Sequence, residues 1–149
     1  NTTPPRYKKW LSWLPYLLIP AALYFGNVVL QTHLGEQALA KVALPQLTLQ
    51  QALAKAKAEN KHVLADMSAI WCPSCRKLDQ EVLSKPSVQA AIEDGYIFTR
   101  IEYESDAGKA FMEQYQVQGF PTLLVLDANG DKLRQLPLTF SPEVFVSLL

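Results

Sequence analysis

The residues best suited to chemistry are two cysteines, Cys72 and Cys75, which are the only cysteines in the chain. A thiol attacks a disulfide as the thiolate, and unpaired N–H groups at the start of a helix favour that form. A helix that begins at Cys72 would place Cys75 one turn later, with the two Cα atoms about 5 Å apart, within the range for a disulfide. The spacing therefore predicts reversible thiol–disulfide chemistry.

The two residues between the cysteines, Pro73 and Ser74, are expected to tune that chemistry. Proline suits the first position of a helix, where its missing N–H group would have no partner. This supports a helix that starts at the pair. Pro73 and Ser74 leave the reduction potential open, since it depends on how well the thiolate is stabilised.

Other roles for the pair are less well supported. A disulfide-stapled scaffold needs more cysteines at wider spacing. A zinc site needs further ligands, and no second cysteine pair exists; His33 lies in an apolar run and His62 at the edge of a strand. Two unreactive buried cysteines are a third alternative, which the neighbouring Trp71 and Pro73 disfavour. We expect no metal and no cofactor apart from the cysteine pair itself.

The elements that would position the pair are readable from the pattern. Thr48 followed by Gln51 is a capping box that predicts a helix ending near Asn60. Residues 62–67 (HVLADM) form an apolar run of strand length, and residues 72–83 are predicted to be helical.

The rest of the chain continues this alternation. The predicted elements are a helix at 88–93 capped by Ser87 and stopping at Gly95, a strand at 96–103, a helix at 106–115, a strand at 122–127, a hairpin turn at Asn129-Gly130, a strand at 132–135 and a helix opened by Ser141 and Pro142. The order αβα(α)βαββα indicates an α/β fold in which helices flank a central mixed sheet.

An acid lies inside the apolar strand that precedes the pair. Asp66 is six residues before Cys72. A carboxylate in an apolar strand is costly to bury without a purpose, whereas a carboxyl with a raised pKa could accept the proton of Cys75. The alternative is an ordinary position at an exposed strand end. We favour the functional interpretation.

The run Trp71-Cys72-Pro73-Ser74-Cys75 at a strand-to-helix turn resembles the active site of the thioredoxin superfamily. Asp66 stands where thioredoxins have a buried acid. Phe120-Pro121-Thr122 after Gly119 is similar to the family's cis-proline loop, and Asn129-Gly130 to the hairpin after it. The resemblance covers about residues 48–149. Within the superfamily, this part of the chain most resembles the periplasmic thioredoxin-like domain of the bacterial transmembrane disulfide reductase.

The resemblance implies roles for the matching residues. Cys72 would attack the partner, Cys75 would resolve the mixed disulfide, and Asp66 would take the proton of Cys75. The basic residue near the family's buried acid would correspond to Arg100. The sequence departs from thioredoxin in having Pro-Ser in place of Gly-Pro between the cysteines, so the potential of thioredoxin does not carry over.

The same resemblance implies a substrate-binding surface made of Trp71, Phe120, Pro121 and Thr122. A cis Pro121 would leave the backbone at Phe120 free to pair with an extended segment of the substrate. The alternatives are an ordinary proline at the entry to a strand and a Trp71 that only packs in the core.

The amino-terminal third predicts a membrane-spanning helix. From Trp10 to Gly35 there is no charged residue, and Leu11–Leu30 has about the 20 residues needed to cross a bilayer. Three aromatic residues lie near one end, where headgroups favour them: Trp10, Trp13 and Tyr16. A cleaved signal peptide, with a small-x-small pattern at Ala38-Leu39-Ala40, and a buried core helix are the alternatives.

Charge gives this helix an orientation. The only charged residues before residue 36 are Arg6, Lys8 and Lys9. The positive-inside rule then keeps the amino terminus in the cytoplasm and places the rest of the chain outside it. Pro15 and Pro20 predict a kinked helix. The expected organisation is a cytoplasmic segment at 1–9, a transmembrane helix at 10–31, a tether at 32–47 and a thioredoxin-like domain at 48–149.

The net charge of the chain is zero, and its basic residues do not form the cluster that nucleic-acid binding would need. Together these features predict a membrane-anchored thiol–disulfide oxidoreductase with its catalytic domain outside the cytoplasm, and the resemblance implies the inner membrane and the periplasm of a bacterium. It would act on protein thiols or disulfides, with a membrane electron donor as a candidate partner, and more as a reductase than as an oxidase. The alternatives are an oxidase or isomerase of exported proteins and a non-catalytic binding module.

Overall fold

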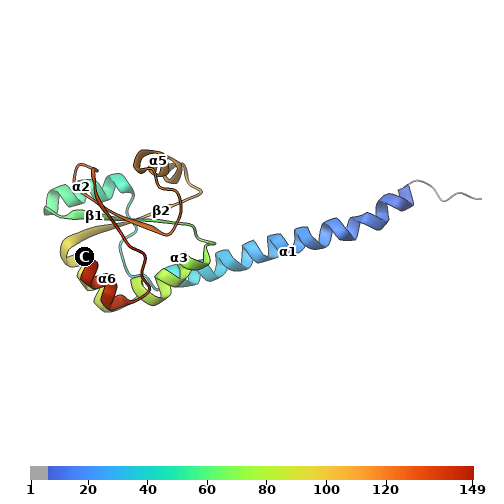
Figure 1. Cartoon of the computed structure of the whole chain (residues 1–149), viewed down its shortest axis with the longest axis horizontal. Helices are drawn as coiled ribbons and strands as arrows, with labels where there is room; N and C mark the ends of the chain where they lie inside the picture. The colour runs from blue at the N-terminus through green and yellow to red at the C-terminus, as the bar shows by residue number, and fades with distance from the viewer. Residues whose placement is uncertain (1–6) are drawn as a thin grey trace, which may run out of the picture.

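The structure, a computed structural model, describes residues 7–149, with side chains from residue 13 onward. Most of the predicted cytoplasmic segment 1–9, including Arg6 and the side chains of Lys8 and Lys9, lies outside the described residues. Helix α1 (Tyr7–Leu39) is continuous through Pro15 and Pro20. It projects from a domain made of residues 40–149 (Figure 1). Its stretch Trp13–Leu39 contains an 18-residue window with a mean hydropathy of 1.5 and is long and apolar enough to cross a membrane.

The domain has the predicted order of elements. They are α2 (Leu49–Glu59), β1 (His62–Ser68), α3 (Pro73–Leu78), the π-helix η1 (Asp79–Leu83), α4 (Pro86–Gly95), β2 (Tyr96–Glu102), α5 (Asp106–Tyr115), β3 (Thr122–Leu126), β4 (Lys132–Leu136) and α6 (Pro142–Leu148). This is the thioredoxin-like α/β arrangement expected from the sequence.

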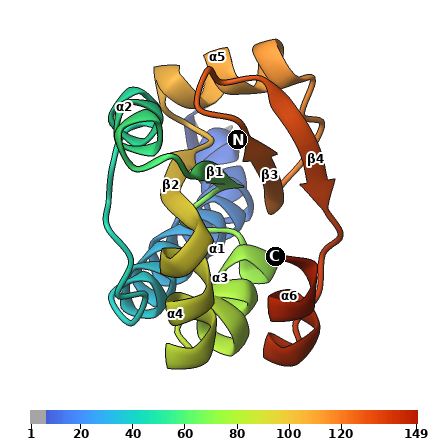
Figure 2. The same ribbon diagram turned by 90° about the vertical axis from the view of Figure 1, so that its left-hand side faces the viewer.

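The four strands form one mixed sheet in the order β2-β1-β3-β4. Strand β1 pairs with β2 in parallel and with β3 antiparallel, and β4 completes the hairpin with β3. Helices α2 and α5 lie on one side of the sheet, whereas α3, α4 and α6 lie on the other (Figure 2). The mixed sheet between two helical layers confirms the predicted fold class.

Alternation along β1 divides the core in two. Val63, Ala65 and Met67 are buried with residues of α2 and α5. Because neighbouring side chains of a strand point to opposite faces, Leu64 and Asp66 face the layer that contains α3. The carboxyl group of Asp66 thus lies on the same side of the sheet as the helix that carries the cysteines.

Most predicted helix ends are confirmed. The Thr48–Gln51 capping box forms, and Asn60 ends α2 in the left-handed conformation. Ser141 caps α6. The predicted cap at Ser87 is wrong, because α4 already begins at Pro86 with Lys85 in the capping position. Proline fits the first position of a helix, and it starts α4 earlier than the apolar pattern alone suggested.

The interval 32–47, expected as a tether, makes extensive contact with the domain. Residues 32–39 complete α1, in which Gly35 and Ala38 are buried. Val42 and Leu44 then enter the core cluster on the α3 side of the sheet. The segment therefore connects the apolar helix to the domain through a packed interface.

Candidate active site

The cysteine pair lies at the start of α3, as the spacing predicts. Cys72 is the N-cap residue, and its Sγ accepts a hydrogen bond from the backbone N–H of Cys75 at 3.2 Å. Pro73 occupies the first helical turn, and the Ser74 Oγ lies 3.3 Å from the same sulfur. A strand end followed by an N-terminal proline thus aims a backbone donor at the sulfur of Cys72.

Both thiols are free and buried. The exposed fractions are 4% for Cys72 and 2% for Cys75, so the two cysteines differ little in burial. Burial is the main cause that raises the pKa of the Cys75 thiol, followed by its hydrogen bond with Cys72; the negative charge of Asp66 contributes in the same direction. Cys75 is therefore a protonated thiol at neutral pH, and it must lose a proton before it can attack.

Beneath the pair lies a buried ion network made of Asp66, Arg100 and Asp79. Asp66 and Arg100 are register partners on β1 and β2, and the guanidinium donates to Asp66 Oδ2 at 2.8 Å. The same group donates to both carboxylate oxygens of Asp79, at 2.5 and 3.0 Å. Ser68 Oγ donates to Asp66 Oδ1 at 2.7 Å. The carboxylate expected at Asp66 is thus completely buried and paired.

One guanidinium compensates two carboxylates in this network, so the cluster carries an excess negative charge. Burial raises the pKa of Asp79 to about 6 even though Arg100 opposes the shift, and the charge of Asp66 adds to the rise. The pKa of Arg100 is raised by the two acids against the effect of burial, which keeps it charged. Asp79 accordingly changes protonation near pH 6.

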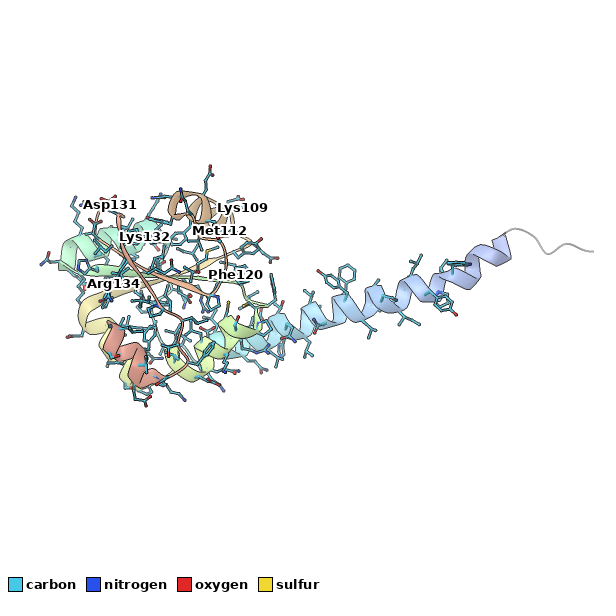
Figure 3. The ribbon with its side chains drawn as sticks, viewed as in Figure 1. Lys109, Met112, Phe120, Asp131, Lys132 and Arg134 are labelled. Atoms are coloured by element: carbon cyan, nitrogen blue, oxygen red, sulfur yellow. The ribbon has the colours of Figure 1, made fainter. Side chains whose placement is uncertain are left out.

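An aromatic cluster borders the cysteines. The ring of Phe120 packs edge-on against Trp71, with 5.6 Å between centroids, and lies tilted against Tyr103, with 4.8 Å between centroids. All three are half-buried and pack against Cys72 and Cys75. In Figure 3, Phe120 lies at the margin of the domain from which α1 projects. The cluster offers an apolar surface directly beside the reactive sulfurs.

The predicted cis-proline loop lies in this cluster. The Phe120-Pro121 peptide bond is cis. Thr122 Oγ1 donates to the carbonyl of Gly119 at 2.7 Å, which closes the loop just before β3 begins. Pro121 and Thr122 are both half-buried. The structure therefore brings two of the four residues expected to bind substrate, Trp71 and Phe120, against the cysteines, and Pro121 and Thr122 follow Phe120 in the chain.

Three neighbours of the site were missed by reasoning from sequence: Asp79, Glu102 and Tyr103. Asp79 lies four residues after Cys75, a spacing that places both on one helical face and could have revealed it. Glu102 accepts a hydrogen bond from the N–H of Ile70 at 3.0 Å, in the loop before Trp71. Its place beside that loop follows from the parallel pairing of β1 with β2, and no local motif indicates it.

A family model described as a thioredoxin-like domain matches residues 49–149. The chain belongs to the thioredoxin-like domain family. Its free cysteine pair at the start of α3 lies within the matched residues.

Named relatives agree with this assignment. The chain is 34% identical over 129 residues to the thiol:disulfide interchange protein DsbD 2 of Pseudomonas aeruginosa, a match that covers 85% of the chain and 21% of that protein. It is 31% identical over 144 residues to DsbD of Salmonella paratyphi A, covering 89% of the chain and 24% of the relative. The chain thus spans between a fifth and a quarter of the length of these curated relatives.

Solved structures support the fold. The oxidised C-terminal domain of DsbD from Neisseria meningitidis superposes with a TM-score of 0.56 at 24% identity, covering 70% of this chain and 95% of that one. A thioredoxin from Thermus thermophilus gives a TM-score of 0.63 at 23% identity, over 70% of this chain and 83% of the other. Both similarities concern the thioredoxin-like fold.

Proposed function

We propose that the chain is a membrane-anchored thiol–disulfide reductase that acts on protein disulfides outside the cytoplasm. The observation that carries this proposal is the asymmetry of the two thiols at the start of α3. Cys72 Sγ receives a backbone hydrogen bond, whereas Cys75 is held as a protonated thiol above a buried acid. Such a pair suits one sulfur to attack first and the other to act second.

In the proposed reaction the Cys72 thiolate attacks one sulfur of a partner disulfide. A bond forms between Cys72 and that sulfur, and the partner's other sulfur leaves as a thiolate that takes up a proton. Cys75 then transfers its proton to Asp66 and attacks Cys72 Sγ, which releases the partner's second thiolate. Two electrons pass to the partner, and the Cys72–Cys75 disulfide remains. An external dithiol must reduce that disulfide before the next turnover.

The surrounding residues have supporting roles in this proposal. Trp71 and Phe120 supply apolar contact to the substrate segment, and Pro121 and Thr122 shape the loop that carries Phe120. Pro73 and Ser74 tune the thiolate of Cys72: the proline by starting the helix, the serine through the 3.3 Å approach of its hydroxyl.

The location rests on α1. Its large apolar side chains are exposed over Trp13–Leu30, as expected of a surface covered by lipid. The basic residues Lys8 and Lys9 at its amino-terminal end favour a cytoplasmic amino terminus. In that orientation the cysteines lie outside the cytoplasm, and we propose the periplasmic face of a bacterial inner membrane, as the resemblance to DsbD suggests.

Trapping tests the catalytic proposal. A full chain with Cys75→Ser cannot resolve the mixed disulfide, so protein adducts bound through Cys72 should accumulate in cells. The control, in which both Cys72→Ser and Cys75→Ser are present, should show none. Equal adducts in the two variants, or none in either, would mean that the pair does not exchange with proteins and would support a non-catalytic module instead.

Equilibration with glutathione buffers tests the direction. A reductase should have a Cys72–Cys75 potential nearer to that of thioredoxin, about −270 mV, than to that of the oxidant DsbA, about −120 mV. The fraction of disulfide is measured by alkylating the free thiols at each glutathione ratio. A potential near the oxidant end would contradict the reductase proposal and favour an oxidase or isomerase.

A further inference from the structure

The carboxyl-terminal part of α1 packs on the loop and helix that carry the cysteines. Its contact residues follow helical spacing: Gln31, Leu34, Gly35 and Ala38 are buried or half-buried, and the residues between them are mostly exposed. Ala38 is 1% exposed. One stripe of α1 is therefore a packed interface, whereas the large apolar side chains earlier in the helix are exposed.

Gly35 is the tightest point of this interface. A Cβ atom at this position would lie 1.9 Å from the backbone carbonyl oxygen of Ile70, a distance that no real side chain tolerates. Ile70 is two residues before Cys72, in the loop that also contains Trp71. The absence of a side chain at Gly35 thus lets α1 touch the backbone of the active-site loop directly.

A second contact joins the same helix to α3. Arg76, one turn after Cys72, donates a hydrogen bond from Nη1 to Oε1 of Gln31 at 2.5 Å. Gln31 is the first residue after the apolar run Leu11–Leu30. The guanidinium of Arg76 therefore lies at the level where the predicted membrane span ends.

The rise per residue of an α-helix gives the height of these contacts above the hydrocarbon core of the bilayer. Gly35 is five residues beyond Leu30, which is about 8 Å along the helix axis. A headgroup layer is roughly 5–8 Å thick on each side of the hydrocarbon core. The backbone of Ile70 and the sulfur of Cys72 two residues later are thus placed at the outer edge of the headgroups.

We propose that α1 is a rigid stalk, docked on the active-site loop through Gln31, Gly35 and Ala38, that holds Cys72 at the membrane surface. This proposal rests on the membrane anchoring proposed above. It identifies the partner as a membrane protein whose reactive sulfur lies at the outer surface of the bilayer. Figures 1 and 3 agree with this placement, since the α3 end of the domain and Phe120 lie on the side from which α1 projects.

The aromatic cluster fits the same location. Trp71, Tyr103 and Phe120 are half-buried beside the sulfurs, and the rings of Trp71 and Tyr103 have polar groups that favour the headgroup layer. Gly35 and Gln31 act through the loop and through Arg76, so they are positioning residues in this proposal.

Quenching of Trp71 fluorescence measures the height directly. Trp71 becomes the only tryptophan in a full chain with Trp10→Phe and Trp13→Phe. This chain is placed in vesicles of phosphatidylethanolamine and phosphatidylglycerol, with or without a nitroxide on a fraction of the headgroups. The nitroxide should quench Trp71 strongly. An emission that the headgroup nitroxide leaves unchanged would overturn the proposal.

Two glycines of α1 provide the matched pair of variants. Gly35→Leu should undock the helix and abolish most of the quenching. Gly26→Leu should leave it unchanged, because nothing lies within 4 Å of a Cβ atom at that position. If Gly35→Leu does not fold, Gln31→Ala removes only the contact to Arg76 and should still weaken the quenching. Equal quenching in all variants would contradict docking.

Thiol exchange separates this proposal from the proposed function. Each variant is reacted with a small soluble disulfide and with the same disulfide attached to a lipid headgroup. The measured quantity is the rate with the lipid-attached disulfide divided by the rate with the soluble one. Both glycine variants remain anchored, so this ratio should be about tenfold lower in Gly35→Leu than in Gly26→Leu if docking is lost. An unsubstituted chain inert to the soluble disulfide would contradict the proposed function. Normal soluble exchange with an unchanged ratio would contradict only the docked stalk.

Discussion

At the scale of single residues, the site combines two thiols with a buried network of uneven charge. Arg100 is shared by Asp66 and Asp79, and the described residues contain no buried side-chain nitrogen or oxygen without a hydrogen-bond partner. A buried ion network is seldom a net gain in stability over apolar packing. Asp66 helps to raise the pKa of Cys75, and this coupling supports the proposed transfer of a proton from Cys75 to Asp66.

Asp79 should make stability depend on pH near neutrality. Its native pKa of about 6 lies above the ordinary value of 3.8, so between these values the native state binds more protons than the unfolded state. The stability that this group contributes is complete below the lower value and is lost as pH rises through the upper one. Relative to Asp79→Asn, the free energy of unfolding of the natural chain should fall by about 3 kcal/mol across that window.

Urea denaturation of both chains at a series of pH values measures this difference. The asparagine variant keeps the shape of the side chain but does not titrate, so the comparison cancels the other ionisable groups. A difference that stays constant across that window would show that the hydrogen bonds from Arg100 outweigh burial and that native Asp79 is a carboxylate throughout it.

Replacing the proposed proton acceptor should slow one step and spare the other. Asp66→Asn leaves Cys72 and its hydrogen bond from Cys75 in place, so the mixed disulfide should form at nearly the normal rate. Its resolution should slow by about a hundredfold, the usual order for loss of a general base. Stopped-flow release of a fluorescent peptide thiol measures the second step.

Asp94→Asn is the matched control, since it makes the same chemical change at an exposed position near the end of α4. If Asp66→Asn slows both steps equally, Asp66 supports the fold of the site and does not accept the proton of Cys75.

At the scale of elements, a close contact joins α5 to the end of β2, next to Tyr103 of the aromatic cluster. A Cβ atom at Gly108 would lie 2.2 Å from the carbonyl oxygen of Glu102 and 2.8 Å from that of Tyr103. Ser105 caps α5 by accepting the N–H of Gly108 at 2.9 Å. The absence of a side chain at Gly108 therefore allows α5 to pack closely against the segment that carries Tyr103 of the aromatic cluster.

Gly108→Ala should accordingly destabilise the domain, by about 1–3 kcal/mol, the usual cost of overpacking. Gly95→Ala is the control, because nothing lies within 4 Å of a Cβ atom there and alanine favours helix. Thermal unfolding followed by circular dichroism compares the two. If both variants unfold at the same temperature, the contact between α5 and β2 accommodates the added methyl group without loss of stability.

The sequence predicted element order well because each element has a local signal, such as the Thr48–Gln51 capping box or the apolar run of β1. It located the cysteines, Asp66 and Pro121 for the same reason. Features that depend on pairing between distant segments had no such signal. The register that sets Arg100 beside Asp66 and the contact of Gly35 with Ile70 arise only when strands and helices pack.

At the scale of the whole molecule, the segment between the apolar helix and the domain belongs to the core. Val42 and Leu44 are 6% and 5% exposed and pack with Leu64, Leu78 and other residues on the α3 side of the sheet. Displacing this segment would expose that core, so residues 40–47 and the thioredoxin-like domain should unfold together. A flexible tether would instead leave the domain's stability independent of residues 40–47.

Leucine-to-alanine substitutions distinguish the two arrangements. Leu44→Ala should lower the free energy of unfolding of the full chain by about 3 kcal/mol, the sum of lost burial and a new cavity. Leu133→Ala should change it by less than about 0.5 kcal/mol, because that side chain on the edge strand β4 is half exposed. Urea denaturation in detergent measures both. Equal, small effects would show that residues 40–47 leave the core readily, and the stalk could not then hold the active site at a fixed height.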